Sequence, residues 1–136
     1  MQLTSHQAQT MIDAGTSKAS EIGVPAVIAV FDAAAHLKAF SRMDGAVLAS
    51  IDIAMKKART AALFECNSEA VWEYCKPGAP AHGLEFSNGG LAPFAGGIPL
   101  KGPTGALVSA EGVSGGAIPQ DFEIARAAVA AFSYHP

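Results

Sequence analysis

The chain has few of the residues that support metal, disulfide and nucleic-acid functions. It contains two cysteines in 136 residues, Cys66 and Cys75, which stand too far apart for the short spacings of zinc ligands. No Cys-x-x-Cys or His-x-x-x-His pattern occurs, so we expect no structural zinc and two reduced thiols. Only 15% of residues are charged and the net charge is −3. The chain therefore lacks the clustered positive charge that binding to nucleic-acid phosphates requires. We therefore expect no nucleic-acid partner.

Long apolar runs are also missing. None approaches the roughly 20 residues of a membrane span, and Met1 leads into polar residues without an apolar signal segment. We therefore expect a cytoplasmic protein with no membrane partner. What the chain has is small apolar residues, since half of it is hydrophobic and it contains 14 glycines. Small residues allow close packing, so part of the apolar surface is expected to lie between subunits of a homo-oligomer.

Hydrophobic periodicity and turn residues divide the chain into helices and strands. A helix capped by Thr4 or Ser5 precedes a hairpin, two further helices, three strands and a closing helix. The later helices are expected to begin at Ser50, Ser68 and near Pro119, and the expected strands are 26–31, 36–43, 91–95, 98–101 and 105–113. This order predicts one domain over residues 1–136, of the α+β class, with a five-stranded antiparallel sheet flanked by helices on both faces.

Three segments, 29–61, 77–100 and 105–132, carry a resemblance when taken together. They contain the short motifs Arg-Met-Asp-Gly, Gly-Gly-Ile-Pro and Gly-Val-Ser-Gly-Gly. In order and spacing they resemble the GlcG/HbpS family, also called the haem-degrading or DUF336 family, which includes the C-terminal domain of PduO-type proteins. The resemblance implies a profilin-like or roadblock-like sheet and assembly into dimers up to octamers. The chain departs from the family pattern at Asp32–His36, where two glycines are replaced by alanine, and at His82, where many relatives carry tyrosine.

The resemblance implies a small-ligand-binding protein, because some family members bind haem or iron and the PduO-type domain binds haem through histidine. Haem or a related tetrapyrrole is the candidate ligand and cofactor, and His82 and His36 are the candidate metal ligands. His82 lies in a Pro- and Gly-rich loop near Glu85 and Asn88, and imidazole serves as a haem ligand or as a general base. The alternatives are a solvent-facing loop for His82 and a structural hydrogen bond for His36.

A second hypothesis is a cofactor-independent enzyme of organic-acid or aromatic catabolism that works by proton transfer, of isomerase, lyase or hydrolase type. The candidate catalytic residues are His82, Glu85 and Glu111. Glu111 stands in an apolar strand, so its pKa is raised if it faces a site, whereas exposure would make it unremarkable. A third hypothesis is an assembly module without ligand chemistry.

The remaining candidates would bind the ligand. Gly115 and Gly116 lead into a helix, where backbone amides gather into a natural anion site. Arg42 can hold a carboxylate, or it can pair with Asp44 instead. Lys57 can neutralise an acid, or it can extend along the surface. The full set of candidate ligand-binding residues is Arg42, Asp44, Lys57, Asn88, Gly96, Gly97, Ser114, Gly115 and Gly116.

Overall fold

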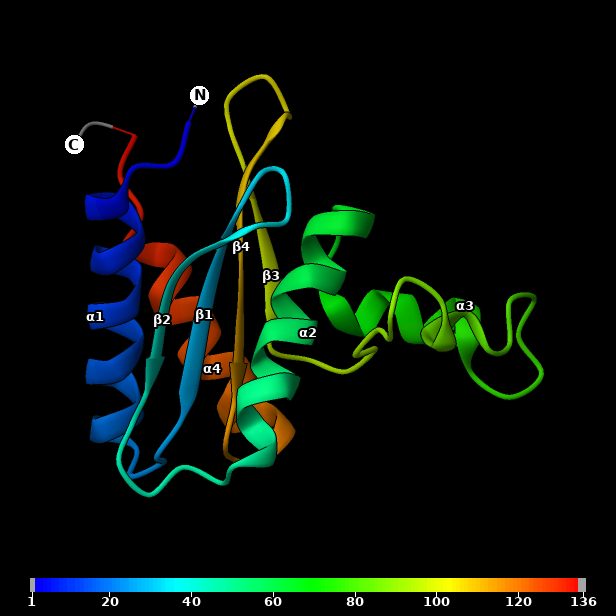
Figure 1. The fold of residues 1–136 in the computed structure, drawn as a ribbon, viewed down its shortest axis with the longest axis horizontal. Helices are drawn as coiled ribbons and strands as arrows, with labels where there is room; N and C mark the ends of the chain where they lie inside the picture. Colours follow the sequence, from blue (N-terminus) through cyan, green and yellow to red (C-terminus); the bar gives the residue numbers. More distant parts are fainter. Residues whose placement is uncertain (1, 135–136) are drawn as a thin grey trace.

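Four α-helices and a four-stranded antiparallel sheet form an α+β fold in the computed structural model, which describes residues 2–134 (Figure 1). No helix in that range is long and apolar enough to cross a membrane. The elements, in chain order, are α1 (Ser5–Glu21), β1 (Val27–Asp32), β2 (Leu37–Arg42), α2 (Ala49–Phe64), the 3₁₀ turn η1 (Ser68–Val71), α3 (Trp72–Cys75), the 3₁₀ turn η2 (Leu84–Phe86), β3 (Gly97–Lys101), β4 (Leu107–Ser114) and α4 (Ile118–Ala130).

The sheet has the strand order β2-β1-β4-β3, and each neighbouring pair is antiparallel. β1 is central and its residues 27–31 are buried, as its run of apolar side chains predicts for a strand covered on both faces. The expected hairpin, β1 with β2, is confirmed. β2 and β3 form the two edges of the sheet.

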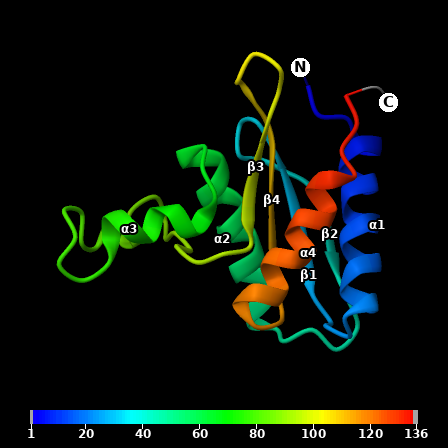
Figure 2. The ribbon, with the colours of Figure 1, turned by 180° about the vertical axis from the view of Figure 1, so that it is seen from behind.

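Helices cover the two faces unequally (Figures 1 and 2). α1 and α4 lie together on one face, where Met11 and Ile124 pack with Ile28 and Val113 in the main core. α2 lies on the other face, against β4, β1 and β3. The same face of β2 stays open, so Leu37 and Phe40 are 48% and 38% exposed.

Two glycines allow α2 to lie directly on the strands. A Cβ at Gly112 would overlap the carbonyl oxygen of Ala54, and one at Gly97 would overlap that of Lys57. Both carbonyls belong to α2, so the helix backbone touches the strand backbone with no side chain between them. The glycines of the sequence motifs thus serve close packing here.

The expected fifth strand, 91–95, is wrong. Pro93 has no backbone N–H, and two other backbone groups of the segment bond to side chains of neighbouring elements. The Ala92 amide donates to the Thr60 hydroxyl at 3.0 Å, and the Phe94 carbonyl accepts from the Ser68 hydroxyl at 2.6 Å. The segment is therefore a strap held by two side chains, with no ladder to a strand.

The helix starts were partly predicted. Thr4 caps α1 through a reciprocal bond with Gln7, as expected. Ser50 and Ser68 do not act as caps, because their side chains are buried against other elements. Ser68 instead donates to the strap and accepts from the Gly97 amide at 2.9 Å.

Residues 68–94, here called the excursion, stand out from the sheet between α2 and β3 (Figures 1 and 2). They contain η1, α3 and η2. Val71, Cys75 and Leu91 form a small apolar core within this segment. The excursion therefore holds its own shape beside the main sheet.

Candidate functional site

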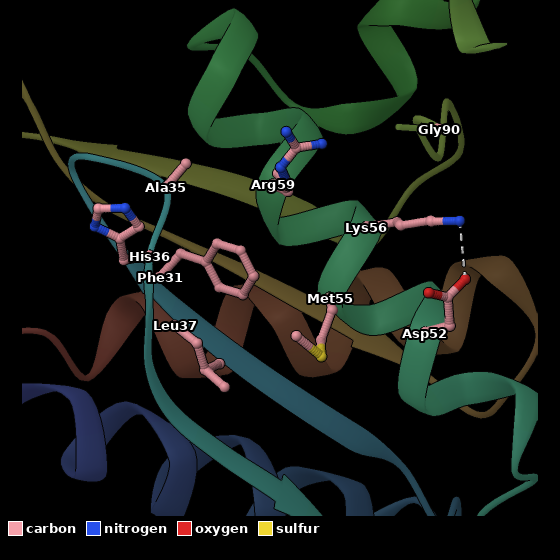
Figure 3. A pocket seen from close by; sticks show the side chains of 9 residues that line it. All are labelled: Phe31, Ala35, His36, Leu37, Asp52, Met55, Lys56, Arg59 and Gly90. Atoms are coloured by element: carbon pink, nitrogen blue, oxygen red, sulfur yellow. Dashed lines mark ion pairs between the residues drawn. The ribbon is translucent and has the colours of Figure 1, made fainter. Parts of the chain in front are cut away.

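An open hollow of about 340 Å³ lies between the β1–β2 hairpin and α2, on the face of the sheet that α2 covers only in part (Figure 3). Its floor is apolar, with Phe31, Leu37 and Met55 grouped between the two walls. His36 lies on the hairpin side, and Lys56 and Arg59 lie on the helix side. Ala35, Asp52 and Gly90 complete the lining.

The hairpin wall is fixed by Asp32. Its carboxylate accepts the backbone amides of Ala34 at 2.9 Å and His36 at 3.0 Å, and Ala35 takes a positive φ of 63°. This is the local bonding expected of an Asp at a turn. The turn uses only the backbone of His36. Its imidazole is exposed and makes no hydrogen bond within the described residues, so the structural alternative for His36 does not involve the ring.

The helix wall carries two cations whose partners are close by. Lys56 Nζ lies 3.1 Å from Asp52 Oδ2 one turn earlier on α2. Arg59 Nη1 donates to the backbone carbonyl of Asn88. The backbone of Asn88 has a positive φ of 55°. The Asn88 side chain itself donates to the Ser87 hydroxyl, so this residue shapes the edge of the hollow through its backbone.

A second cluster, next to the hollow in sequence but closed to solvent, surrounds Lys57. Its side chain is 1% exposed, and Nζ lies 3.0 Å from Asp121 Oδ2 and 2.8 Å from the Val113 carbonyl oxygen. The Phe94 ring centroid lies 5.5 Å from the same nitrogen. Burial lowers the pKa of Lys57, and the Asp121 carboxylate opposes that shift. The expectation of a surface lysine is wrong.

Two other predicted ligand-binding residues, Gly96 and Gly116, contact this second cluster, whereas Ser114 contacts Ser50. The Gly116 amide donates to Asp121 Oδ1 at 2.8 Å, and Gly96 lies so close to the Lys57 side chain that a Cβ there would overlap it. Ser114 Oγ is buried and lies 3.3 Å from Ser50 Oγ. The anion at the start of α4 is therefore the chain's own Asp121, a residue that the sequence reasoning missed. An Asp in the first turn of a helix was the available signal.

Arg42 and Asp44 are both exposed, and within residues 2–134 they form no ion pair with each other. Arg42 pairs in register with Val27 and so points to the same face of the sheet as Phe40 and the hollow. Its guanidinium, at the end of β2 opposite to His36, has no partner among the described residues.

His82 and Glu85 lie on the excursion, away from the hollow. His82 Nδ1 is 3.3 Å from the Cys75 carbonyl oxygen, and Glu85 Oε1 is buried with no hydrogen-bond partner in the part of the chain that the structure describes. The loop before η2 is at the outer end of the excursion, whereas the start of α4 lies beneath the sheet end (Figure 1). Within one chain, His82 and Glu85 are therefore not brought together with the backbone amides of the expected anion site at the start of α4.

Glu111 lies on the other side of the sheet. It stands between Val30 and Ile98 in register, and both of these side chains pack into the core beneath α1 and α4. The residue is fully buried, neither carboxyl oxygen has a hydrogen-bond partner among residues 2–134, and burial raises its pKa well above the usual value. The alternative that Glu111 is exposed to solvent is therefore wrong. Its carboxyl group lies on the face of the sheet opposite to the hollow.

The described residues contain no group of three or more His, Cys, Asp or Glu side chains placed to hold a bare metal ion. Together, the fold and the hollow define a small α+β protein with a ligand-sized, largely apolar depression beside an antiparallel sheet.

Residues 3–130 match the family model described as haem degrading protein HbpS-like, and the chain belongs to that family. It is 33% identical to the corrinoid adenosyltransferase PduO of Salmonella typhimurium over 96% of this chain, but it spans only 39% of that protein.

Two crystal structures share the fold along nearly their whole length. Protein ORFY of Klebsiella pneumoniae, assigned to DUF336, has a TM-score of 0.94 and 33% identity over 100% of this chain and 94% of its own. The PduOC:heme complex has a TM-score of 0.93 and 33% identity over 98% of this chain and 96% of its own.

Proposed function

We propose that this chain binds haem or a related tetrapyrrole in the hollow, with His36 as the iron ligand. The observation that carries the proposal is a free imidazole at the rim of an apolar floor whose opposite wall is cationic. The similarity to a protein whose structure is that of a heme complex supports the choice of ligand class.

The residues present fit the chemistry of haem. An apolar macrocycle suits a floor of Phe31, Leu37 and Met55, and the hollow's volume of about 340 Å³ falls at the lower end of small-molecule sites. The two carboxylates of such a ligand suit Lys56 and Arg59, which lie together on α2. Arg42, with its free guanidinium on the same face, can add a third positive charge.

The chain itself would present one ring nitrogen of His36 to the iron and would exclude water from one side of the ligand. Because Asp32 holds the backbone of His36, the imidazole is positioned without using either ring nitrogen. When bound, haem supplies an iron centre whose redox potential depends on its axial ligand and surroundings. His82 offers the other candidate imidazole, in a loop that does not border the hollow.

Titration with hemin, followed by the Soret band, tests the proposal with a matched pair of variants. We expect His36→Ala to shift the band and weaken affinity about tenfold or more, equivalent to about 1.4 kcal/mol. His82→Ala should titrate like the wild type, since it removes the same side chain from a loop elsewhere. A wild-type chain that leaves the spectrum of hemin unchanged would contradict the proposed function. A loss confined to His82→Ala would move the site to the excursion.

A further inference from the structure

A second cavity, of about 480 Å³, lies between the excursion and the start of α4, beyond the β3 edge of the sheet (Figure 2). We call it the side cavity. It shares no lining residue with the hollow, and its volume falls within the range of small-molecule sites. The side chains that line it come from η1, α3, the strap and α4, and they include Glu69, Trp72, Glu73, Pro93, Phe94 and Ile118.

The apolar part of the side cavity is largely aromatic. The Trp72 side chain comes from α3 and the Phe94 ring from the strap, and they are 43% and 41% exposed. Pro93 and Ile118 complete the apolar lining. The faces of aromatic rings attract cations, and tryptophan does so most strongly. The apolar lining therefore suits a ligand that carries a positive charge on an apolar body.

The charged part of the side cavity is acidic. Both of its ionisable side chains are carboxylates, Glu69 and Glu73, and no lysine, arginine or histidine of the described residues lines it. Glu73 pairs with Lys76 at 2.7 Å, outside the lining. Glu69 is therefore the carboxylate that an incoming ligand can use.

One oxygen of Glu69 lacks the partner that its burial calls for. Oε1 accepts from the side-chain amide of Asn67 at 3.1 Å, which holds the carboxylate in place. Oε2 is closed to solvent and has no hydrogen-bond partner in the part of the chain that the structure describes. A buried polar atom without a partner is costly, and an ammonium group in the side cavity would supply the missing donor.

Positive groups near the side cavity are already neutralised inside the fold. The Lys57 ammonium lies 5.5 Å from the centroid of the Phe94 ring, and it is held by Asp121 and by the Val113 carbonyl. The Gly116 amide, just before α4, donates to the same aspartate. An anion would therefore meet the two glutamates without a free cation to bind it, which excludes anions as the ligand class.

We propose that the side cavity binds a small organic cation, a primary ammonium group on an apolar body. The ammonium would donate to Glu69 Oε2, and the apolar body would lie against Trp72 and Phe94. This site does not depend on the proposed function. The hollow, with Lys56 and Arg59 on its wall, repels such a cation, and the glutamates of the side cavity repel the carboxylates of haem.

The chain provides its own probe for this test, because Trp72 is its only tryptophan and lines the side cavity. The full-length protein is titrated with phenethylamine while its tryptophan fluorescence is recorded, and phenethyl alcohol serves as the uncharged analogue. We expect a saturable change with the amine and about tenfold weaker binding of the alcohol. No saturable change up to about 10 mM amine, or equal affinity for the two compounds, overturns the proposal.

Two matched pairs of variants locate the binding. Glu69→Gln keeps the shape of the side chain and removes its charge, and Glu65→Gln makes the same change at an exposed position outside the side cavity. We expect the first to weaken amine binding about tenfold and the second to leave it unchanged. Phe94→Leu should weaken it about fivefold, whereas Phe86→Leu, on the excursion but outside the lining, should not. Equal losses within either pair overturn the assigned site.

Hemin titration separates this proposal from the proposed function. Glu69→Gln should bind hemin like the wild type, and His36→Ala should bind the amine like the wild type. A chain that binds the amine and leaves the spectrum of hemin unchanged supports the side cavity and contradicts the proposed function. A chain in which saturating hemin displaces the amine has one shared site, which overturns the side cavity as a separate site.

Discussion

Lys56 and Lys57 are neighbours on α2, and each pairs with an aspartate at nearly the same distance, 3.1 Å and 3.0 Å. Their surroundings differ completely. The Lys57 side chain is 1% exposed and its partner 2%, whereas the Lys56 side chain is 38% exposed and its partner 70%. One pair is sealed between α2, β4 and α4, and the other stands at the rim of the hollow.

The contrast shows that a charged side chain in a glycine-rich setting need not belong to a binding site. The Lys57 ammonium is saturated by Asp121, by a backbone carbonyl and by the Phe94 ring, so it joins parts of the fold. The Lys56 ammonium pairs with Asp52, and both side chains are exposed to solvent. An exposed ion pair of this kind is weak. Only the second arrangement leaves a charge that an incoming carboxylate can use.

Lys57→Met is expected to have the largest effect on stability. It leaves Asp121 buried without a counter-charge, which should lower the free energy of unfolding by about 3–5 kcal/mol. Urea denaturation followed by circular dichroism measures this change.

The double variant Lys57→Met with Asp121→Asn is the control for that prediction. The side-chain amide that replaces the Asp121 carboxylate has no charge to bury, and its oxygen still accepts from the Gly116 amide, so most of the lost stability should return. If the single variant is as stable as the wild type, Lys57 and Asp121 do not form the pair described here.

Glu111 extends the comparison to a buried carboxyl group that has no hydrogen-bond partner among residues 2–134. Its pKa is raised in the folded state, so the folded chain binds more protons than the unfolded chain above about pH 4.3. Stability should therefore fall as the pH rises from that value toward the folded pKa, at up to about 1.4 kcal/mol per pH unit.

Glu111→Gln should remove this part of the slope, so the variant gains stability relative to the wild type as the pH rises. Urea denaturation between pH 5 and 8, with the exposed Glu65→Gln as a control, measures it. Parallel pH profiles for the wild type and Glu111→Gln would show that this carboxyl ionises freely in the fold.

Gly112→Ala tests the close backbone contact between α2 and β4, which positions Lys56 and Lys57. A methyl group at this position meets the α2 backbone at Ala54, so α2 must shift, at a cost of about 1–3 kcal/mol in the free energy of unfolding. Gly102→Ala, whose Cβ would meet only ordinary contacts, should change stability much less. Equal effects of the two substitutions would show that the helix does not touch β4 at Gly112.

Lys56→Met should have the smallest effect on stability, within about 0.5 kcal/mol, because an exposed ion pair contributes little. Its effect should appear in hemin affinity, which should fall a few-fold at low salt. High salt should lower the affinity of the wild type in the same way, because it screens the Lys56 charge. A variant with unchanged affinity at low salt would remove Lys56 from the site.

Much of the fold could be predicted from the sequence because local patterns determine it. The Thr4 cap, the buried run of β1 and Pro119 in the first turn of α4 each follow from neighbouring residues. The segment 91–95 was misassigned because its apolar residues fit a strand, whereas its backbone bonds to Thr60 and Ser68, which lie far away in sequence.

The site was harder to predict for the same reason. Lys57 contacts Asp121 only because α2 and α4 both pack at the end of β4, and no spacing in the sequence predicts that contact. His36 was a candidate, but its neighbours in the hollow come from α2 and from Gly90, which the sequence does not place near it. Glu111 was recognised as anomalous, yet the face toward which it points depends on the register of β4.

Hydrogen–deuterium exchange with and without hemin tests most directly which of the two lysine clusters receives the ligand. We expect hemin to slow exchange in peptides covering 35–38 and 55–59 and to leave the peptide covering 93–97, beside the Lys57 pair, unchanged. Protection that falls on 93–97 and spares the hairpin and α2 would contradict it, because the ligand would then enter at the buried pair.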